Sequence, residues 1–475
     1  MTFANAAVEY NANIPTRTAN GMKAFTTTKS NVLDLFSAIG SSRGHDIGAQ
    51  FAAALTENDD LTIRMLLWAR DIREGAGERQ QFRNLLVALE GYNAALAGRL
   101  LSKIPQLGRW DDVFAYVDPI NREHAFAFIK EALLNKDGLC AKWMPRKGPV
   151  ATELTRWMGL TPKQYRKLIV GLTNVVETKM CAKDWEAINF SHVPSVASAR
   201  YQKAFGRNAT ESYATYIREL QKPITERAVG VKINAGAVYP YDVLRSVWNG
   251  NPSVADAQWE ALPNFVGDAK VFPIVDTSGS MGATGHYGRG EGGNVSPIEA
   301  SISLGLYCSG KNTGAFKDLF MIFDSTPRLI TAKGTLSQRL AQIKSINAGS
   351  TNLHAAFDML LDIAVKGKVP QEDMPNVLLI LSDMQFNCCT NYDDHAQEMI
   401  LRKYKEAGYE HPKVVYWNLS MYGADNQPVR FDENGTALVS GFSPSIMKSV
   451  LAYDLENYTP YNIMLKTLMS DRYAY

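Results

Sequence analysis

The chain has 475 residues, more than one ordinary hydrophobic core accommodates, so we expect at least two domains. Its composition, 46% hydrophobic and 21% charged residues, is typical of a soluble globular protein. No apolar run approaches about 18 residues, and residues 1–6 lack the charged and apolar parts of a secretory signal, which argues against membrane insertion and export. We therefore expect a cytoplasmic protein.

The net charge of +2 conceals an uneven distribution. Residues 1–250 contain 32 Lys and Arg against 24 Asp and Glu, whereas residues 251–475 contain 18 against 24. A basic half beside an acidic half favours nucleic acid as a ligand of the first and a cation as a ligand of the second. Chance variation of the surface is the alternative.

The five cysteines are an odd number without the spacing of a CxxC metal pair. This usage fits a reducing compartment and free thiols. The neighbouring Cys388 and Cys389 leave a redox-active pair open as a second interpretation.

Residues 30–250 carry apolar side chains at helical spacing, as in Asn31–Ile39 and Leu61–Trp68. Short breakers such as Arg73–Gly77 and Pro145–Pro149 separate these segments. The pattern predicts a string of α-hairpins, which usually stack as a solenoid, although the sequence has no clean repeat period.

After residue 265 the pattern changes to short apolar strands that alternate with helices. Continuous apolar strands are typical of a parallel sheet covered on both faces, so a doubly wound α/β domain is predicted. We expect a helical domain, 1–262, and an α/β domain, 263–475, joined by a connection at 251–268. The expected strands are Lys270–Val275, Leu319–Phe323, Val377–Leu381 and Val414–Leu419, and the expected helices are Pro297–Cys308, Leu336–Ile346, Leu353–Ala364, His395–Ala407 and Ser443–Leu451.

Three loops of the predicted α/β domain carry oxygen ligands suited to a metal ion. Ligands of open α/β sheets bind beyond the carboxyl ends of the strands, where the loops converge. The loop after the first strand supplies Asp276, Ser278 and Ser280. A loop before a helix supplies Thr351, and the end of the buried strand supplies Asp383. Hard hydroxyl and carboxylate oxygens, some acting through water, suit Mg²⁺ or another divalent cation and leave a position for water or an anionic group.

The Asp-x-Ser-x-Ser segment is a weak signal by itself, because Asp and Ser cap helices and form turns throughout proteins. After a hydrophobic strand, and joined by Thr351 and Asp383 in this order, it resembles the metal-ion-dependent adhesion site of the von Willebrand factor A family. The resemblance implies a Rossmann-like domain that binds ligands through its metal and usually catalyses nothing. We expect no enzyme, also because the seven histidines are scattered without a catalytic set.

Residues 282–293 are richer in glycine than the turn after the first metal loop requires. One interpretation is a mobile loop that folds over a ligand, with His286, Tyr287 and Arg289 touching phosphate or base. The other is a disordered insertion. The Gly-Lys-Ser/Thr ending of a P-loop is absent. Asp324, at the end of a strand, is expected to shape a turn.

Six segments spread over the chain carry a second resemblance. They are Val238–Leu244, Ile346–Thr351, Ser440–Phe442, Arg70–Arg79, Lys142–Lys147 and Ser382–Phe386. With a helical half followed by an A-type domain, the chain is similar over nearly its whole length to the Ro autoantigen family, also called TROVE-domain proteins; the last three segments resemble a less characterised branch. The resemblance implies a ring of HEAT-like helical repeats closed by the A-type domain. It implies as partners small structured noncoding RNA, single-stranded RNA ends and an exoribonuclease or other protein, and a monomeric ring.

Cations gather in two short stretches of the helical half. Lys and Arg neutralise phosphates without reading sequence, so such clusters suit contact with an RNA backbone. Trp143, Trp157 and Tyr165 lie nearby and are candidates for stacking on unpaired bases. The alternative is a solvated helix face with its aromatic residues in the core. The candidate RNA-binding residues are Lys142, Arg146, Lys147, Arg156, Lys163, Arg166 and Lys167.

Charges alternate within Arg70–Arg79, so its arginines either line a pore or pair with the neighbouring acids. We expect a salt-bridge network at the end of a helix. In Gly108–Val113 the same reasoning predicts capping by Asp111 and packing by Trp110.

Two hypotheses from different classes remain. The first, favoured by the charge distribution, is a ribonucleoprotein scaffold that binds small noncoding or misfolded RNA in RNA quality control. The second is a metal-dependent protein-interaction or assembly module without RNA, in which a partner's acidic side chain completes the metal site.

Overall fold

The computed structural model describes residues 15–248, 252–282, 295–323, 326–343, 350–388, 393–421, 426–451 and 457–475. The chain forms two compact units. The sheet unit comprises residues 1–65 and 238–472, and the helical unit comprises residues 66–237 and 473–475. No helix among the described residues is both long and apolar enough to cross a membrane.

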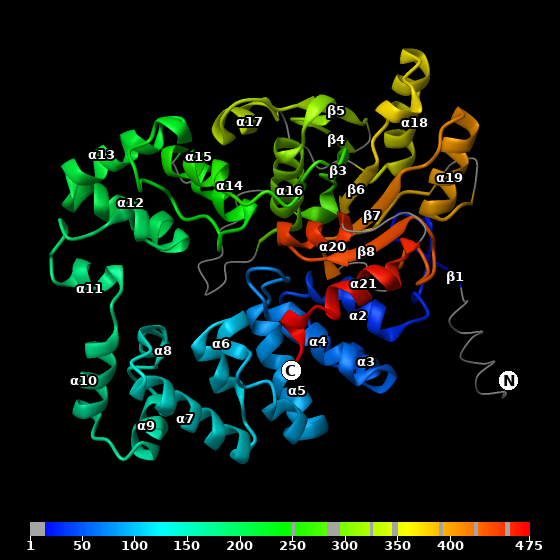
Figure 1. Cartoon of the computed structure of the whole chain (residues 1–475). Coiled ribbons are helices and arrows are strands. Elements are labelled where there is room, and N and C mark those ends of the chain that lie inside the picture. Colours follow the sequence, from blue (N-terminus) through cyan, green and yellow to red (C-terminus); the bar gives the residue numbers. More distant parts are fainter. Residues whose placement is uncertain are drawn as a thin grey trace. The chain divides into compact units, whose positions relative to one another are not determined.

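The sheet unit is built on one six-stranded sheet (Figure 1). Its strands are β3 (Val271–Asp276), β4 (Leu319–Phe323), β5 (Arg328–Thr331), β6 (Val377–Ser382), β7 (Lys413–Asn418) and β8 (Thr436–Ser440). They lie in the order β5-β4-β3-β6-β7-β8. All neighbours are parallel except β5, which pairs antiparallel with β4 at the edge.

The strand order reverses between β3 and β6, because the chain moves outward from β3 to β4 and then returns to the other side of β3. Every residue of β3 and β6 is buried, as expected for central strands covered on both faces. At such a reversal the loops leave the two strands in opposite directions and open a crevice at their carboxyl ends. The loops after Asp276 and Ser382 therefore meet at the place where the fold favours a ligand.

Helices surround this sheet. They are α2 (Asn31–Ile39), α3 (Gly48–Glu57), α14 (Pro240–Trp248), α15 (Pro252–Glu260), α16 (Pro297–Lys311), α17 (Leu336–Gln342), α18 (Leu353–Gly367), α19 (Ala396–Ala407), α20 (Met447–Leu451) and α21 (Pro460–Leu468). Helix α16 contacts β3, β4 and β6, whereas α2 and α21 contact β8. Gly305 permits the close approach of α16, since a Cβ there would lie 2.4 Å from Cγ2 of Val275. This contact holds the end of β3 against the helix that follows it.

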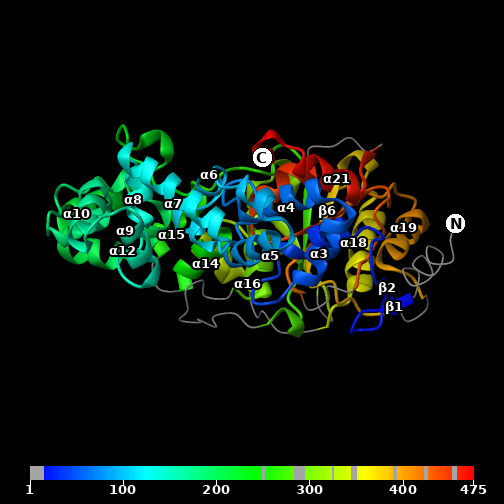
Figure 2. The same cartoon turned by 90° about the horizontal axis from the view of Figure 1, so that it is seen from below.

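The sheet unit also contains an N-terminal β-hairpin that was not predicted. Strands β1 (Pro15–Arg17) and β2 (Lys23–Phe25) pair antiparallel, and single bridges join the hairpin to Asn387, His395 and Gln427 of the sheet unit. Figure 2 shows this hairpin beside α19. The turn holds an Asn20-Gly21 pair, in which Gly21 has a φ of +89°. That dipeptide is a recognised hairpin signal, but three-residue strands give too little alternation to be noticed.

The helical unit consists of successive helices. After α4 (Asp59–Arg70), which leads into it, they are α5 (Arg79–Gly98), α6 (Ile104–Leu107), α7 (Pro119–Leu134), α8 (Gly138–Trp143), α9 (Pro149–Trp157), α10 (Pro162–Leu172), α11 (Val176–Cys181), α12 (Ser195–Asn208) and α13 (Thr210–Leu220). Contacts join α5 to α7, α7 to α8, α8 to α10 and α12 to α13. The predicted fold class, helical hairpins together with a doubly wound parallel sheet, is confirmed.

The division into compact units differs from the predicted boundary at residue 262, because residues 15–65 and 238–262 group with the sheet. The predicted connection at 251–268 is not irregular throughout, since α15 occupies Pro252–Glu260. Its buried Val254 and Trp259 explain why a short, proline-flanked segment still forms a helix.

Charged residues in the helical unit form a salt-bridge network, but the partner of Arg70 and the capping residue differ from the prediction. Arg70, only 2% exposed, pairs with Asp112 rather than with an acid of its own segment, at 2.7 Å from Nη2 to Oδ2. Arg83 donates to the other oxygen of Asp112 at 2.7 Å, and Asp111 pairs with Arg109. Asp112, not Asp111, accepts the backbone N–H of Arg109 and so caps the 3₁₀ turn. The packing role predicted for the buried Trp110 is confirmed.

Candidate metal site and cationic helices

Asp276 is the last residue of β3, and its side chain is fully buried. The backbone N–H of Ser278 donates to Oδ1 at 2.8 Å, and the hydroxyl of Ser382 donates to Oδ2 at 2.5 Å. The two donors come from the loop after β3 and from the end of β6, so each fixes one oxygen of the carboxylate. The role of Ser382 was not predicted, because a serine at a strand end has no distinctive pattern.

Asp383 follows β6 directly and is also fully buried. The backbone N–H of Gln385 donates to its Oδ1 at 3.1 Å. Its Oδ2 is buried without a hydrogen-bond partner. A buried polar atom left unpaired costs free energy, which makes this oxygen the clearest indication that something is to be bound here.

The electrostatics of the two carboxylates favour a cation. Burial and then repulsion by Asp383 raise the pKa of Asp276 to about 7. Burial likewise raises the pKa of Asp383. Neither forms an ion pair with a Lys or Arg among the described residues. A positive ion between them would offset both the burial and the mutual repulsion.

The hydroxyl groups predicted as ligands lie at the same edge of the sheet. Ser278 is buried and Ser280 is exposed, with their Oγ atoms 3.2 Å apart. Thr351 is fully buried just before α18, and its backbone oxygen accepts from Asn387 in the loop after β6 at 2.9 Å. Within the described ranges no three His, Cys, Asp or Glu side chains gather as a metal cluster. A cation held here would therefore depend on hydroxyl oxygens and water as well as the two carboxylates.

The N-terminal hairpin reaches this site through Asn20. Its Nδ2 lies 3.5 Å from Oγ1 of Thr351 and donates to the backbone oxygen of Gln385 at 2.6 Å. The backbone N–H of Ala19 donates to Oε1 of the buried Gln385. The hairpin thus braces the loop that carries Asp383. No sequence signal places residues 18–21 there, because the contact joins positions more than 330 residues apart.

Several sequence predictions lie outside the described residues. These are Asp324, Cys389 and nearly all of the glycine-rich stretch, including His286, Tyr287 and Arg289. Cys388 is an exposed free cysteine.

The predicted RNA-binding cations occupy α8, α9, α10 and the turns between them. Lys142 is half-buried, and the other six are exposed. None of the seven forms an ion pair with the described part of the chain. Their charge is thus available to an external anion. The six exposed cations are Arg146, Lys147, Arg156, Lys163, Arg166 and Lys167.

The three aromatic residues near these cations differ in how far their rings are exposed. Tyr165 is 3% exposed and donates its hydroxyl to the backbone oxygen of Pro145 at 3.0 Å, so the prediction that it stacks on a base is wrong. The guanidinium of Arg109 lies 3.8 Å from the centre of the Trp143 ring and covers one face of it. Trp157 is 37% exposed, which leaves it as the more accessible ring.

Two family models match the chain in succession. Residues 153–268 match a domain of unknown function, DUF2828, and residues 270–464 match another, DUF7788. The two matches meet close to the boundary predicted at residue 262. The first lies mostly in the helical unit, and the second covers the strands and the candidate metal site.

A curated relative covers almost the whole chain. It is the uncharacterized protein L728 of Acanthamoeba polyphaga mimivirus, 27% identical over 520 residues that include 95% of this chain and 86% of the relative. Among solved structures, the crystal structure of the Deinococcus radiodurans RO (RSR) protein matches 89% of this chain and 99% of its own, with a TM-score of 0.49 and 12% identity.

Proposed function

We propose that this protein is an RNA-binding scaffold that holds small structured or misfolded RNA on the cations of α8 to α10. The observation that carries the proposal is the set of six exposed cations between residues 146 and 167, which have no ion-pair partner among the described residues. Unpaired cations on adjoining short helices release counterions from phosphates at little desolvation cost. The excess of basic residues in 1–250 and the resemblance to TROVE-domain proteins support the same interpretation.

The sheet unit is proposed to bind a divalent cation, with Mg²⁺ as the best fit. The residues that would hold it are Asp276, Ser278, Ser280, Thr351 and Asp383. The free Oδ2 of Asp383 and the absence of a lysine or arginine partner among the described residues support this donor set. When bound, the ion would neutralise the two carboxylates and offer a position to an anionic group. We assign it a binding role and no catalytic one.

The metal site also supports a second function, docking of a protein partner through an acidic side chain. The favouring observation is that Ser280 is exposed while the other four predicted ligands are buried, so one side of the site is open to an external group. The two functions occupy different units and are separable by experiment. RNA binding on scattered cations weakens steeply with salt, whereas one metal-bridged carboxylate contact is lost with a chelator.

The RNA proposal is tested by salt titration of a structured small RNA against the full chain. In the variant R146Q/K147Q/R166Q/K167Q we expect the slope of log affinity against log salt to fall by roughly 3, since each phosphate contact contributes about 0.7 to 0.9. The control K317Q/K333Q/K368Q/K405Q removes four exposed lysines of the sheet unit and the same total charge. If the slope of log affinity against log salt were the same for both variants, the RNA would not be bound by the cations of α8 to α10.

A further inference from the structure

The salt-bridge network around Asp111 and Asp112 contains more arginines than acids. Nε of Arg83 donates to Oδ1 of Asp112 at 2.7 Å, and Nε of Arg70 donates to Oδ2 at 2.7 Å. Arg109 donates to both oxygens of Asp111, with Nε at 2.8 Å from Oδ1. Nη2 of Arg83 also lies 3.0 Å from Oδ2 of Asp111. All four carboxylate oxygens are therefore already occupied by arginines.

Arg79 is a further arginine beside this network, and no acceptor is left for it. It lies four residues before Arg83 on α5, so the two side chains share one face of the helix. It forms no ion pair and no side-chain hydrogen bond with the described part of the chain. Burial, and then repulsion by Arg109 and Arg83, outweigh the attraction of the two aspartates and lower the pKa of Arg79. Its position is therefore unfavourable unless an anion is present.

The network opens to solvent on one side. Arg70 and Asp112 form its buried base, whereas the side chains of Arg83 and Arg109 are 25% and 28% exposed. Arg79 is half-buried. A guanidinium has five N–H donors, so Arg79 keeps all of them, and Nη1 of Arg83 and of Arg109 has no acceptor within the described ranges. The surplus of donors over acceptors thus lies on the open side.

Packing holds Arg109 in its position. Its guanidinium lies 3.8 Å from the centre of the Trp143 ring. A Cβ on Gly108 would lie 2.5 Å from Nε of Arg70 and 2.7 Å from Oδ2 of Asp112, so the backbone before Arg109 rests directly on the buried pair. Donors that are fixed before a ligand arrives lose little conformational entropy when it binds.

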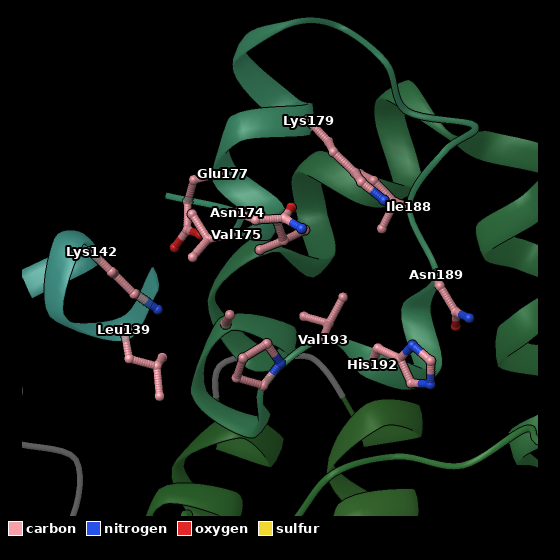
Figure 3. A pocket seen from close by; sticks show the side chains of 13 residues that line it. Leu139, Lys142, Asn174, Val175, Glu177, Lys179, Ile188, Asn189, His192 and Val193 are labelled. Atoms are coloured by element: carbon pink, nitrogen blue, oxygen red, sulfur yellow. The ribbon is translucent and has the colours of Figure 1, made fainter. Parts of the chain in front are cut away.

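The same arginines adjoin the cations of α8 to α10. Nζ of Lys142, on α8, lies 5.3 Å from the centre of the Trp143 ring that Arg109 covers. Lys142 also borders a cavity of about 280 Å³ between α8, α11 and the beginning of α12 (Figure 3). An anion bound by the arginines is thus either the end of a strand that continues over α8 or a separate small molecule.

The charge balance indicates the class of anion. Three arginines paired with two aspartates leave one positive charge, and Arg79 adds a second. A phosphate monoester carries about −1.5 to −2 charges near pH 7, whereas a phosphodiester or a carboxylate carries about one. Guanidinium groups also match phosphate oxygens with pairs of N–H donors. A phosphate monoester therefore fits both the charge and the donors.

We propose that Arg79, together with Arg83 and Arg109, binds a phosphate monoester. The site lies outside the exposed cations of residues 146–167 to which the proposed function assigns RNA. Its phosphate belongs either to the end of an RNA strand or to a free small molecule, and the test separates these two sources.

The first arm of the test uses decauridylates with a 5′-phosphate, a 3′-phosphate or hydroxyl groups at both ends. Each displaces a fluorescent decauridylate from the full chain at low salt, which anisotropy follows. If the phosphate ends an RNA strand, one phosphorylated form should compete about tenfold more strongly than the hydroxyl form, the size of one charge-assisted hydrogen bond.

The second arm titrates the full chain with uridine monophosphate and with uridine by calorimetry. If the site takes a free small molecule, the monophosphate should bind at least about tenfold more tightly than uridine. The end groups of the decauridylates should then make no difference.

Arg79→Gln should remove the gain from phosphate in whichever arm shows it. Its Tm should not fall, because Arg79 forms no ion pair with the described residues. Arg207→Gln is the matched control, since it removes the same charge from an exposed arginine of α12 whose Nε donates to the backbone oxygen of Lys203. This control should keep the gain.

No gain from phosphate in either arm, or a gain that survives Arg79→Gln, would overturn the inference. Failure of the proposed RNA-binding function is seen separately, as the absence of salt-dependent binding of structured RNA. That result does not alter what uridine monophosphate is expected to show.

Discussion

The two units offer ligands opposite kinds of surface. The sheet unit presents two fully buried carboxylates, each oriented by hydrogen bonds from its own loop or from a neighbouring strand. The helical unit presents exposed cations that no acid of the described chain holds in place. A buried site is organised before its ligand arrives and discriminates by geometry, whereas a cationic surface attracts by charge and discriminates little. We infer that the exposed cations of the helical unit provide affinity for phosphate rather than sequence specificity.

The contrast between the two units depends first on metal binding by the buried site of the sheet unit. Asp276→Ala removes the carboxylate that both loops orient, so we expect the affinity for Mg²⁺ to fall at least ~100-fold by calorimetric titration. Binding of structured RNA should be unchanged, because the cations of α8 to α10 are untouched. Asp268→Ala, at an exposed position of the same unit, is the control and should titrate as the unaltered chain does. An unchanged Mg²⁺ titration of Asp276→Ala would refute the site assignment.

A smaller effect concerns the pH dependence of stability. The pKa of Asp276 is about 7 in the folded chain, against 3.8 for a free aspartate side chain. Between these values the folded state binds more protons, so the stability of the metal-free protein falls as pH rises through this window. Bound Mg²⁺ should remove this loss of stability. We therefore expect the rise in Tm caused by Mg²⁺ to be about 5 °C larger near pH 8 than near pH 5.

Calorimetric melting with and without Mg²⁺ measures this difference. A rise in Tm that is the same at both pH values would mean that Asp276 does not exchange a proton for the ion. The exposed cations of the helical unit provide the contrast, since an RNA-induced rise in Tm should respond to salt and little to pH in this range.

The strands that could be predicted are those that the neighbouring residues in the sequence identify by themselves. Val377–Leu381 and Lys270–Val275 are continuous apolar runs, and a parallel sheet covered on both faces requires such runs. Once they are placed, the fold brings their carboxyl ends together, which is why Asp276 and Asp383 could be paired in advance. The edge strands β5 and β8 were not predicted, because β5 is half exposed and β8 begins and ends with the polar residues Thr436 and Ser440.

What could not be predicted depends on contacts between distant parts of the chain. The brace from Asn20 to the loop at Gln385, the hydrogen bond from Ser382 to Asp276 and the pairing of Arg70 with Asp112 all join residues that local pattern cannot relate. Tyr165 was misassigned for the same reason, since aromatic residues at helical spacing give no indication of which ring is covered until neighbouring helices are placed.

The central claim is tested most directly by purifying the full chain from its native cells at low salt and dividing the sample between a salt gradient and a chelator. The account predicts a discrete set of small structured RNAs that salt releases and the chelator leaves bound. A preparation without RNA, from which the chelator instead releases a protein partner, would contradict it and establish the metal-bridged interaction module.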